Sequence, residues 1–169
     1  MSVLKIYKNA FSKEKAAEAI SVINQRDDWY NDIPVPERLR LHWDQWPYFD
    51  EVKNTALNDL ATKYDITAFF VRYKTGTECF KHVDSSMFSA VGFLQKPEKG
   101  GELYIEDELI DLDVGDIVLF HGSDSHRANK VLEGNKFSLA LFLNVKGFWE
   151  KEYQRQGRKP VQWDQGQWD

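Results

Sequence analysis

The sequence predicts a mainly β domain with flanking helices, folded as a double-stranded β-helix (jelly roll, cupin-like). Three observations support this fold class. Two helical patterns occur early in the chain, eight short strand-like runs then follow one another, and turns rich in Gly, Pro or charged residues separate these runs. A doubly wound parallel sheet would instead alternate strands with helices.

The first elements are a strand and two helices. Residues 3–7 alternate like a short strand. Ser12 then offers an N-cap for a helix that runs through residues 13–20 toward Asn24. A second helix is predicted over residues 49–63. Its apolar face would consist of Val52, Ala56, Leu57 and Leu60.

Eight strand-like runs follow this helical preface. They cover residues 66–74, 78–84, 87–95, 102–106, 109–112, 116–120, 126–132 and 136–145. Packed as two sheets, they would leave an open mouth where ligands can enter without breaking the core. We expect a single domain over residues 1–169, with helices that buttress one of the sheets.

Composition narrows the class of protein. A hydrophobic content of 42% is sufficient for one buried core. Lys and Arg number 22 against 27 Asp and Glu, and no basic tract is present, so nucleic acid is not expected as a partner. The single cysteine, Cys79, excludes an internal disulfide, and neither a signal peptide pattern nor a membrane-spanning apolar run occurs. We therefore expect a cytoplasmic protein without membrane attachment, whose oligomeric state is left open.

The most informative short motif is His82-Val83-Asp84. Residues two apart in a strand share a face, so His82 and Asp84 can point at one metal ion. A second imidazole from a distant strand would complete the two-histidine, one-carboxylate triad, which leaves metal positions open and suits non-haem Fe(II). His126 is predicted for that ligand, and His121 is the alternative because it directly follows the strand over residues 116–120. A surface pair in a strand is the other interpretation of His82 and Asp84.

The motif stands among other elements in a specific order. These elements are residues 71–76, 89–94, 100–105, 114–120, His126 and residues 134–139. Their order and spacing resemble the 2-oxoglutarate/Fe(II)-dependent dioxygenase superfamily, and within it the prolyl-4-hydroxylase-like branch, over a catalytic core of about residues 66–148. The resemblance implies that His82, Asp84 and His126 bind iron. It also favours His126 over His121, because the segment 127–131 looks like the usual sequel to the distal histidine.

The resemblance further implies three residues that bind the cosubstrate. Lys136, ten residues after His126, falls where the family places the basic residue that pairs with the distal carboxylate of 2-oxoglutarate. Ser138 matches a hydroxyl often found two residues later, and Tyr73 matches a tyrosine that hydrogen-bonds the same carboxylate. A solvated lysine, a hydroxyl near a turn and a core aromatic are the structural alternatives.

The implied activity is an Fe(II)- and 2-oxoglutarate-dependent hydroxylation of an unactivated C–H bond, with O2 consumed, 2-oxoglutarate decarboxylated to succinate and ascorbate as an optional reductant. The branch suggests prolyl 4-hydroxylation of a peptide, and a free amino acid or other small molecule is the alternative substrate. A non-catalytic metal-binding jelly-roll protein is a further alternative. It would need no cosubstrate anchor, so Lys136 and Ser138 favour catalysis. The negative charge disfavours nucleic-acid demethylation.

Two segments are less regular. Residues 26–50 are rich in Trp, Tyr and Pro and would form either a substrate lid between Trp29 and Tyr48 or an irregular cover over a sheet edge. His42 lies in this segment and is expected to be structural. In the tail, residues 146–169, a short helix is expected in the first half, and the last residues would fray or join an oligomer interface.

Overall fold

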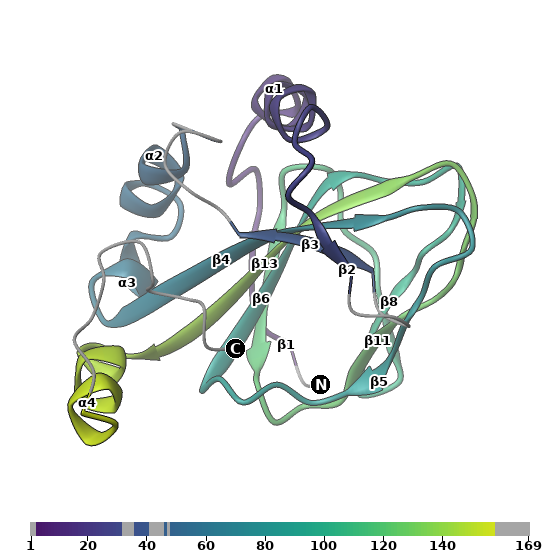
Figure 1. Cartoon of the computed structure of the whole chain (residues 1–169). Helices are drawn as coiled ribbons and strands as arrows, with labels where there is room; N and C mark the ends of the chain where they lie inside the picture. The colour runs from purple at the N-terminus through teal and green to yellow at the C-terminus, as the bar shows by residue number, and fades with distance from the viewer. Residues whose placement is uncertain (1–2, 32–35, 41–45, 47, 158–169) are drawn as a thin grey trace.

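The computed structural model describes residues 3–31, 36–40, 46 and 48–157, and two facing antiparallel sheets dominate it (Figure 1). The larger sheet has the order β1-β10-β6-β13-β4-β3-β2. Its strands are β1 (Val3–Tyr7), β10 (Ile117–His121), β6 (Phe88–Gln95), β13 (Lys136–Val145), β4 (Tyr64–Tyr73), β3 (Glu37–Arg40) and β2 (Tyr30–Asn31). The smaller sheet has the order β5-β11-β8-β9. Its strands are β5 (Cys79–His82), β11 (His126–Ala128), β8 (Leu103–Ile105) and β9 (Glu108–Ile110).

The remaining elements are a short strand pair and the helices. The pair consists of β7 (Lys99–Gly100) and β12 (Val131–Glu133). The helices are α1 (Lys13–Ile23), α2 (Phe49–Asn54), α3 (Asn58–Ala61) and α4 (Phe148–Arg155). In the described part of the chain, no helix is both long and apolar enough to cross a membrane.

Strand β13 organises the larger sheet because it pairs with β4 on one side and with β6 on the other. Its side chains alternate between the two faces of the sheet, as they do in any strand. Leu139 and Leu141 belong to the core under the helices, whereas Lys136 and Ser138 face a cavity toward the smaller sheet. One strand therefore supplies both the hydrophobic core and the polar lining of the cavity.

The helices cover one face of the larger sheet. Ser12 caps α1 by accepting a hydrogen bond from the backbone N–H of Lys15, as its position before the helix predicts. The buried face of α1 packs into the same core as Trp46 and Phe70, whose ring centroids lie 6.1 Å apart. Burying such aromatic and aliphatic surface against a sheet is the main stabilising term for short helices.

A second core holds the two sheets together at one end. It is made of apolar residues from β6, β8, β9 and β10 and the loop that follows β9: Phe93, Leu103, Ile105, Ile110, Leu112, Val118 and Phe120. Toward the other end β4 and β13 lie opposite β5 and β11 (Figure 1), and residues of all four strands line a cavity. The sheets are therefore closed by hydrophobic contacts on one side and open to ligands on the other.

The predicted fold class is confirmed, and three of the predicted elements need correction. The helix expected over residues 49–63 is two short helices, because the backbone leaves helical geometry at Thr55. The strand expected over residues 126–132 is interrupted between β11 and β12. The segment 26–50 contributes the hairpin β2–β3, which pairs with β4 and extends the sheet. His42 and the interval 158–169 lie outside the described residues.

Candidate metal centre

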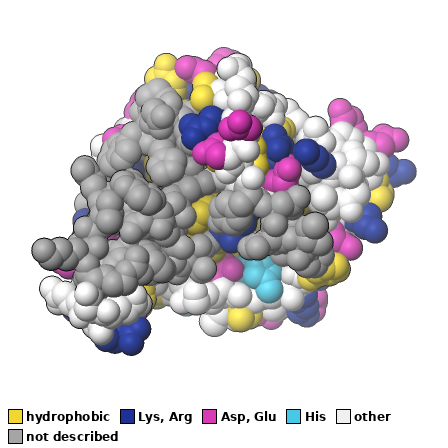
Figure 2. Space-filling view, viewed as in Figure 1, with side chains coloured by type: hydrophobic (Ala, Val, Ile, Leu, Met, Phe, Trp, Pro, Cys, Tyr) yellow, Lys and Arg dark blue, Asp and Glu magenta, His cyan; other side chains and the backbone are white. Residues whose placement is uncertain are grey.

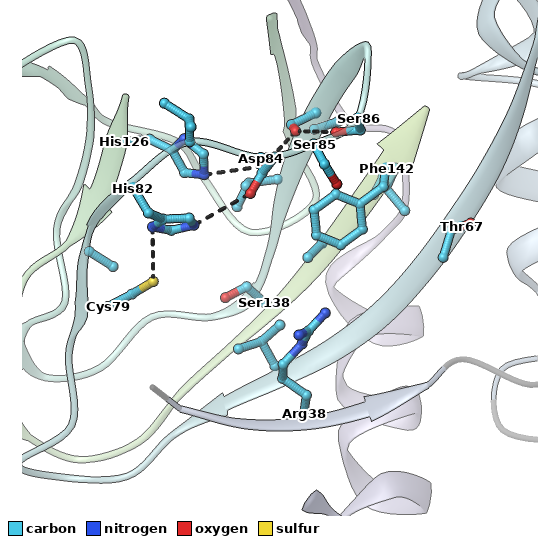
Figure 3. Close-up of a pocket in the computed structure, with 18 of the residues that line it drawn as sticks. Arg38, Thr67, Cys79, His82, Asp84, Ser85, Ser86, His126, Ser138 and Phe142 are labelled. Carbon is cyan, nitrogen blue, oxygen red and sulfur yellow. Dashed lines mark hydrogen bonds and ion pairs between the residues drawn. The ribbon is translucent and has the colours of Figure 1, made fainter. Parts of the chain in front are cut away.

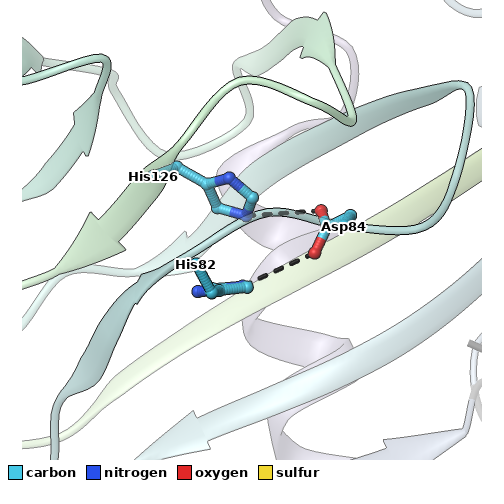
Figure 4. Close-up of side chains that lie close together, drawn as sticks. All are labelled: His82, Asp84 and His126. Carbon is cyan, nitrogen blue, oxygen red and sulfur yellow. Dashed lines mark ion pairs between the residues drawn. The ribbon is translucent and has the colours of Figure 1, made fainter.

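The three predicted ligands come together at one end of the smaller sheet (Figure 4). His82 ends β5 and His126 begins β11, and the two residues are direct partners in the antiparallel ladder. Their ring centroids lie 4.3 Å apart. Asp84 completes the group, and the potential ligand atoms of all three residues lie within 4.8 Å of one another.

Asp84 reaches the group from a loop and not from a strand, which corrects the geometry expected for the His82-Val83-Asp84 motif. β5 ends at His82, and the N–H of Asp84 donates to the carbonyl oxygen of Gly122 over 2.8 Å. The chain can approach this closely because residue 122 has no side chain. A Cβ there would lie 1.9 Å from the carbonyl oxygen of Ser86.

Both imidazole rings are oriented by backbone carbonyl groups. The Nδ1 atom of His82 lies 2.7 Å from the carbonyl oxygen of Phe80, and that of His126 lies 2.9 Å from the carbonyl oxygen of Asp124. Since a carbonyl only accepts, each Nδ1 carries the proton, and in the neutral ring each Nε2 keeps a lone pair for a metal. Hydrogen bonds of this kind are the usual outer-shell support of metal-binding histidines.

Both Nε2 atoms point at Asp84. The distances to its carboxylate oxygens are 3.5 Å from His82 and 3.3 Å from His126, and Ser89 Oγ donates to the same carboxylate over 2.6 Å. Burial alone would raise the pKa of Asp84, but the hydrogen bonds from both histidines and from Ser89 outweigh it and hold the pKa well below its usual range. The Asp84 hydrogen bond, together with contact to Cys79, raises the pKa of His82 to about 10.

The group fits a divalent transition metal. Two imidazole nitrogens and one carboxylate on the same side of a metal form the facial arrangement that non-haem Fe(II) prefers, with the other coordination positions open. The carboxylate is ionised, and a metal would bind each imidazole through an unprotonated Nε2. Asp84 and His126 are nearly buried, whereas 41% of the His82 side chain is exposed. Solvent therefore reaches the group mainly on the side of His82.

A cavity of about 850 Å³ opens beside the three residues. Its lining comes from β3, β4, β6 and β13 of the larger sheet, from β5, β8 and β11 of the smaller one, from the loop that follows β5 and from α4. His82 and Asp84 lie on one side of it, opposite Ser138 and Arg38 (Figure 3). On the face shown in Figure 2, histidine is exposed close to an acidic and a basic side chain. The volume is in the range of small-molecule sites.

Lys136 lies in the wall of this cavity and is almost completely buried, with 3% of its surface exposed. Its Nζ atom donates to the carbonyl oxygen of Gly101 over 2.9 Å and lies 4.6 Å from the ring centroid of Tyr73 and 5.1 Å from that of Phe93. Burial lowers the pKa of Lys136 to about 8. The solvated lysine considered from the sequence is therefore excluded.

Ser138 and Tyr73 line the cavity beside Lys136. Lys136 and Tyr73 are direct partners across β13 and β4, and Ser138 is the next residue of β13 on the same face. Both Ser138 and Tyr73 are buried. Burial raises the pKa of the Tyr73 hydroxyl well above its usual value, so it stays a neutral donor. Two neutral hydroxyls and one ammonium thus face the same cavity.

His121 and Cys79 lie outside the group of three candidate ligands. His121 ends β10, is exposed and lies against the ring of Phe88 at 5.4 Å. It is not part of the group at Asp84. Cys79 is half-buried, and its Sγ lies 3.7 Å from Nδ1 of His82, on the ring nitrogen that faces away from Asp84.

Several cavity residues were not predicted from the sequence. They are Arg38 on β3, Thr67 on β4, Ser89 on β6, Phe142 on β13, Phe148 and Glu152 on α4, and Gln156 directly after that helix. Ser89 was detectable as part of the strand 87–95, but nothing in the sequence connected it with Asp84. Arg38 had no such signal because the strand that carries it was not recognised.

No protein-family model matches the chain. Among curated proteins, the chain is similar to a PKHD-type hydroxylase of Aliarcobacter butzleri, with 26% identity over 132 residues, 62% of this chain and 58% of the relative. A PKHD-type hydroxylase of Parvibaculum lavamentivorans is 32% identical over 105 residues, 51% of this chain and 46% of the relative. The chain thus spans about half the length of the curated relatives it matches.

Solved structures match over most of the chain. The collagen prolyl hydroxylase of Paramecium bursaria Chlorella virus-1, in its 2-oxoglutarate complex, has a TM-score of 0.68 at 17% identity and covers 84% of this chain and 96% of its own. The prolyl-4-hydroxylase of Pseudomonas putida has a TM-score of 0.64 at 16% identity, covering 85% and 92%. A Trichoplax adhaerens prolyl hydroxylase, bound to a peptide fragment of hypoxia inducible factor, has a TM-score of 0.70 at 14% identity, covering 89% and 86%. The resemblance inferred from the motifs is confirmed: the chain has the fold of the 2-oxoglutarate/Fe(II) oxygenases, with prolyl hydroxylases among its structural neighbours.

Proposed function

We propose that the chain is an Fe(II)- and 2-oxoglutarate-dependent hydroxylase, and that His82, Asp84 and His126 hold the iron. One observation carries this proposal: a histidine–aspartate–histidine group opens onto a cavity whose wall contains a buried lysine. A purely structural metal site would need neither the cavity nor the lysine. A buried ammonium is unfavourable unless something pairs with it, so its presence in the wall favours an anionic ligand.

Lys136 is the proposed anchor for the distal carboxylate of 2-oxoglutarate, with Ser138 and Tyr73 as hydroxyl donors to the same group. In the free protein Lys136 donates to the Gly101 carbonyl, a neutral acceptor. A carboxylate is a stronger partner for an ammonium than a carbonyl, because charge-assisted hydrogen bonds are about twice as strong. Cosubstrate binding would therefore give the Lys136 ammonium a charged partner, which the free protein lacks although burying this charge is unfavourable.

The protein's other contributions are orientation and exclusion of water. The Phe80 and Asp124 carbonyls hold the two rings, and Ser89 holds the Asp84 carboxylate, so the three ligands are organised before any metal binds. Bound there, Fe(II) would supply the redox chemistry by which R–H, O2 and 2-oxoglutarate become R–OH, succinate and CO2. The apolar walls of the cavity would keep that chemistry away from bulk water.

For the substrate we propose a peptidyl proline. Support comes from two structural neighbours, one described as a collagen prolyl hydroxylase and another solved with a peptide fragment bound. Proline-rich peptides are already stiff in the polyproline II form and lose little entropy when they dock on aromatic surface. The segment between Trp29 and Tyr48 is rich in such side chains, and part of it, β3, forms one wall of the cavity.

Incubation of the protein with Fe(II), 2-oxoglutarate, ascorbate and a panel of proline-rich peptides is expected to add one oxygen atom to a peptide proline. One succinate should form per hydroxylated residue, and the added oxygen should come from ¹⁸O2. Mass spectrometry of the peptides and quantification of succinate measure both. The variant His121→Ala, which changes an exposed histidine outside the metal group, should keep the activity.

Two outcomes of this assay distinguish an error in the substrate class from an error in the hydroxylase activity itself. Inert peptides together with a hydroxylated free amino acid would refute the substrate class and leave the iron and 2-oxoglutarate assignments standing. Absence of succinate in every reaction, from protein shown by calorimetry to be folded, would refute the hydroxylase itself.

The affinity for 2-oxoglutarate is expected to fall as the pH rises from 7 to 9. Burial lowers the pKa of Lys136 to about 8, and only the protonated amine pairs with a carboxylate. The dissociation constant should therefore rise above pH 8, approaching about tenfold per pH unit. Titration calorimetry on protein loaded with Mn(II) measures it. Lys136→Arg keeps the charge without titrating, so the same slope in that variant would show that Lys136 is not its cause.

A further inference from the structure

Arg38 is a second cationic side chain in the cavity, and the proposed chemistry does not use it. It lies on β3, next to β4, and points into the cavity across from His82 and Asp84 (Figure 3). In the sheet register Arg38 pairs with Val71, and Val71 pairs with Ser138. Arg38 is therefore level with Ser138, two residues along the strand direction from Lys136, and β3 is separated from β13 by β4. Strand spacing puts the two backbones roughly 12 Å apart. The two cations are thus separate anchoring points.

The setting of Arg38 suits recognition of a carboxylate. Its guanidinium carbon lies 4.5 Å from the ring centroid of Phe69. Phe69 in turn meets Phe142, a cavity residue, edge to face at 6.0 Å. A guanidinium is planar by resonance, and contact with an aromatic ring restricts how that plane is oriented, which favours binding of a carboxylate through two parallel hydrogen bonds.

The cosubstrate does not require this second cation. The two positive charges of the metal and the one on Lys136 balance the carboxylate of Asp84 and the two carboxylates of 2-oxoglutarate. Arg38 nevertheless acts on the interior of the cavity: burial raises the pKa of Tyr73, and the positive charge of Arg38 opposes that rise. With Lys136 paired to the cosubstrate, a further carboxylate in the cavity would be attracted to Arg38 on β3.

We propose that Arg38 binds a carboxylate of the substrate, so that the molecule hydroxylated by this protein carries a carboxylate close to the reacting C–H bond. This inference rests on the proposed hydroxylase function and narrows its substrate class. Two sources supply the same chemistry: the α-carboxylate of a free amino acid, and the side-chain carboxylate of an Asp or Glu that neighbours the target residue in a peptide.

Matched pairs of probes test the proposal. Free amino acids including L-proline are compared with their carboxamides, and proline peptides with Asp next to the proline are compared with the same peptides carrying Asn. Succinate release and the gain of one oxygen are measured with protein loaded with Fe(II) and 2-oxoglutarate. In at least one arm the carboxylate member is expected to have a KM at least tenfold lower than its amide partner. The arm that shows the preference identifies the source.

Variants then assign the preference to Arg38. Arg38→Gln should abolish it, and Arg38→Lys should restore part of it because the charge remains. The matched control is Arg26→Gln, an arginine that binds both carboxylate oxygens of Asp28 away from the cavity and should leave the preference intact. Melting temperatures and the affinity for 2-oxoglutarate are measured on every variant, so that a folding defect is recognised.

Three results would overturn the inference and leave the proposed function standing. In the first, wild-type protein consumes 2-oxoglutarate but has the same KM for each carboxylate probe as for its amide partner. The preference is then absent, and the proposed function still stands. A preference that survives in folded Arg38→Gln belongs to another residue. An Arg38→Gln variant that loses 2-oxoglutarate affinity identifies a cosubstrate anchor. Wild-type protein that neither binds 2-oxoglutarate nor forms succinate would instead remove the proposed function, and this inference with it.

Discussion

His82→Ala, Asp84→Ala and His126→Ala are each expected to lower the affinity for Mn(II), an air-stable substitute for Fe(II), by more than about 100-fold. Loss of an outer-shell partner alone typically costs 10- to 100-fold in metal affinity, and each of these variants removes one of three direct ligands. Calorimetric titration of the purified variants measures the change. Turnover should disappear in parallel, because no other group in the described chain replaces the missing ligand.

Two further variants make this experiment specific. His121→Ala should bind metal like the wild type, since that ring is exposed and lies against Phe88. Ser89→Ala should have an intermediate effect, because its hydroxyl only orients the carboxylate of Asp84. If His121→Ala loses the metal while His126→Ala retains it, the assignment of the distal ligand is wrong.

The residues of this group could be predicted from the sequence, but the way they meet could not. Strand alternation was expected to align His82 with Asp84, yet β5 ends at His82 and a loop carries Asp84. The backbone of that loop is fixed by the carbonyl of Gly122, a residue far along the chain. A contact of this kind depends on the close approach of two loops, and no local pattern encodes it.

The residues on the proposed substrate side of the cavity were harder to predict from the sequence. On β3, Leu39 faces the core whereas Arg38 faces the cavity, so the strand has a charged residue where a fully buried strand would have an apolar one. β3 is short and mostly charged, a composition typical of a loop, so the sequence did not predict the hairpin that β3 forms with β2. The prediction of one continuous helix over residues 49–63 was wrong for a different reason. Its apolar face was real, since Val52, Leu57 and Leu60 are buried, but two short helices satisfy the same pattern.

Lys136→Met is expected to weaken 2-oxoglutarate binding by about 2 to 5 kcal/mol while leaving Mn(II) affinity nearly unchanged. The loss is large because the cosubstrate carboxylate would remain buried without its charged partner. Calorimetry on Mn(II)-loaded protein measures both affinities. Lys130→Met, which removes an exposed lysine, is the matched control and should change neither.

The same substitution is expected to stabilise the free protein, and this opposite sign distinguishes an anchor from a structural residue. Burial lowers the pKa of Lys136 from 10.5 to about 8, which corresponds to a cost of roughly 3 kcal/mol for keeping the amine charged at neutral pH. Methionine fills similar space without a charge, so the melting temperature should rise by several degrees.

The pH dependence of stability supplies a second check on the same variant. Between pH 8 and 10.5 the unfolded chain holds a proton on Lys136 that the folded chain has released, so the free energy of unfolding of the wild type gains a contribution that increases with pH in that window. Lys136→Met should lack that contribution. A variant that loses both stability and 2-oxoglutarate affinity would mean that Lys136 supports the fold, whereas one that gains stability and keeps its affinity would mean that the carboxylate is bound elsewhere.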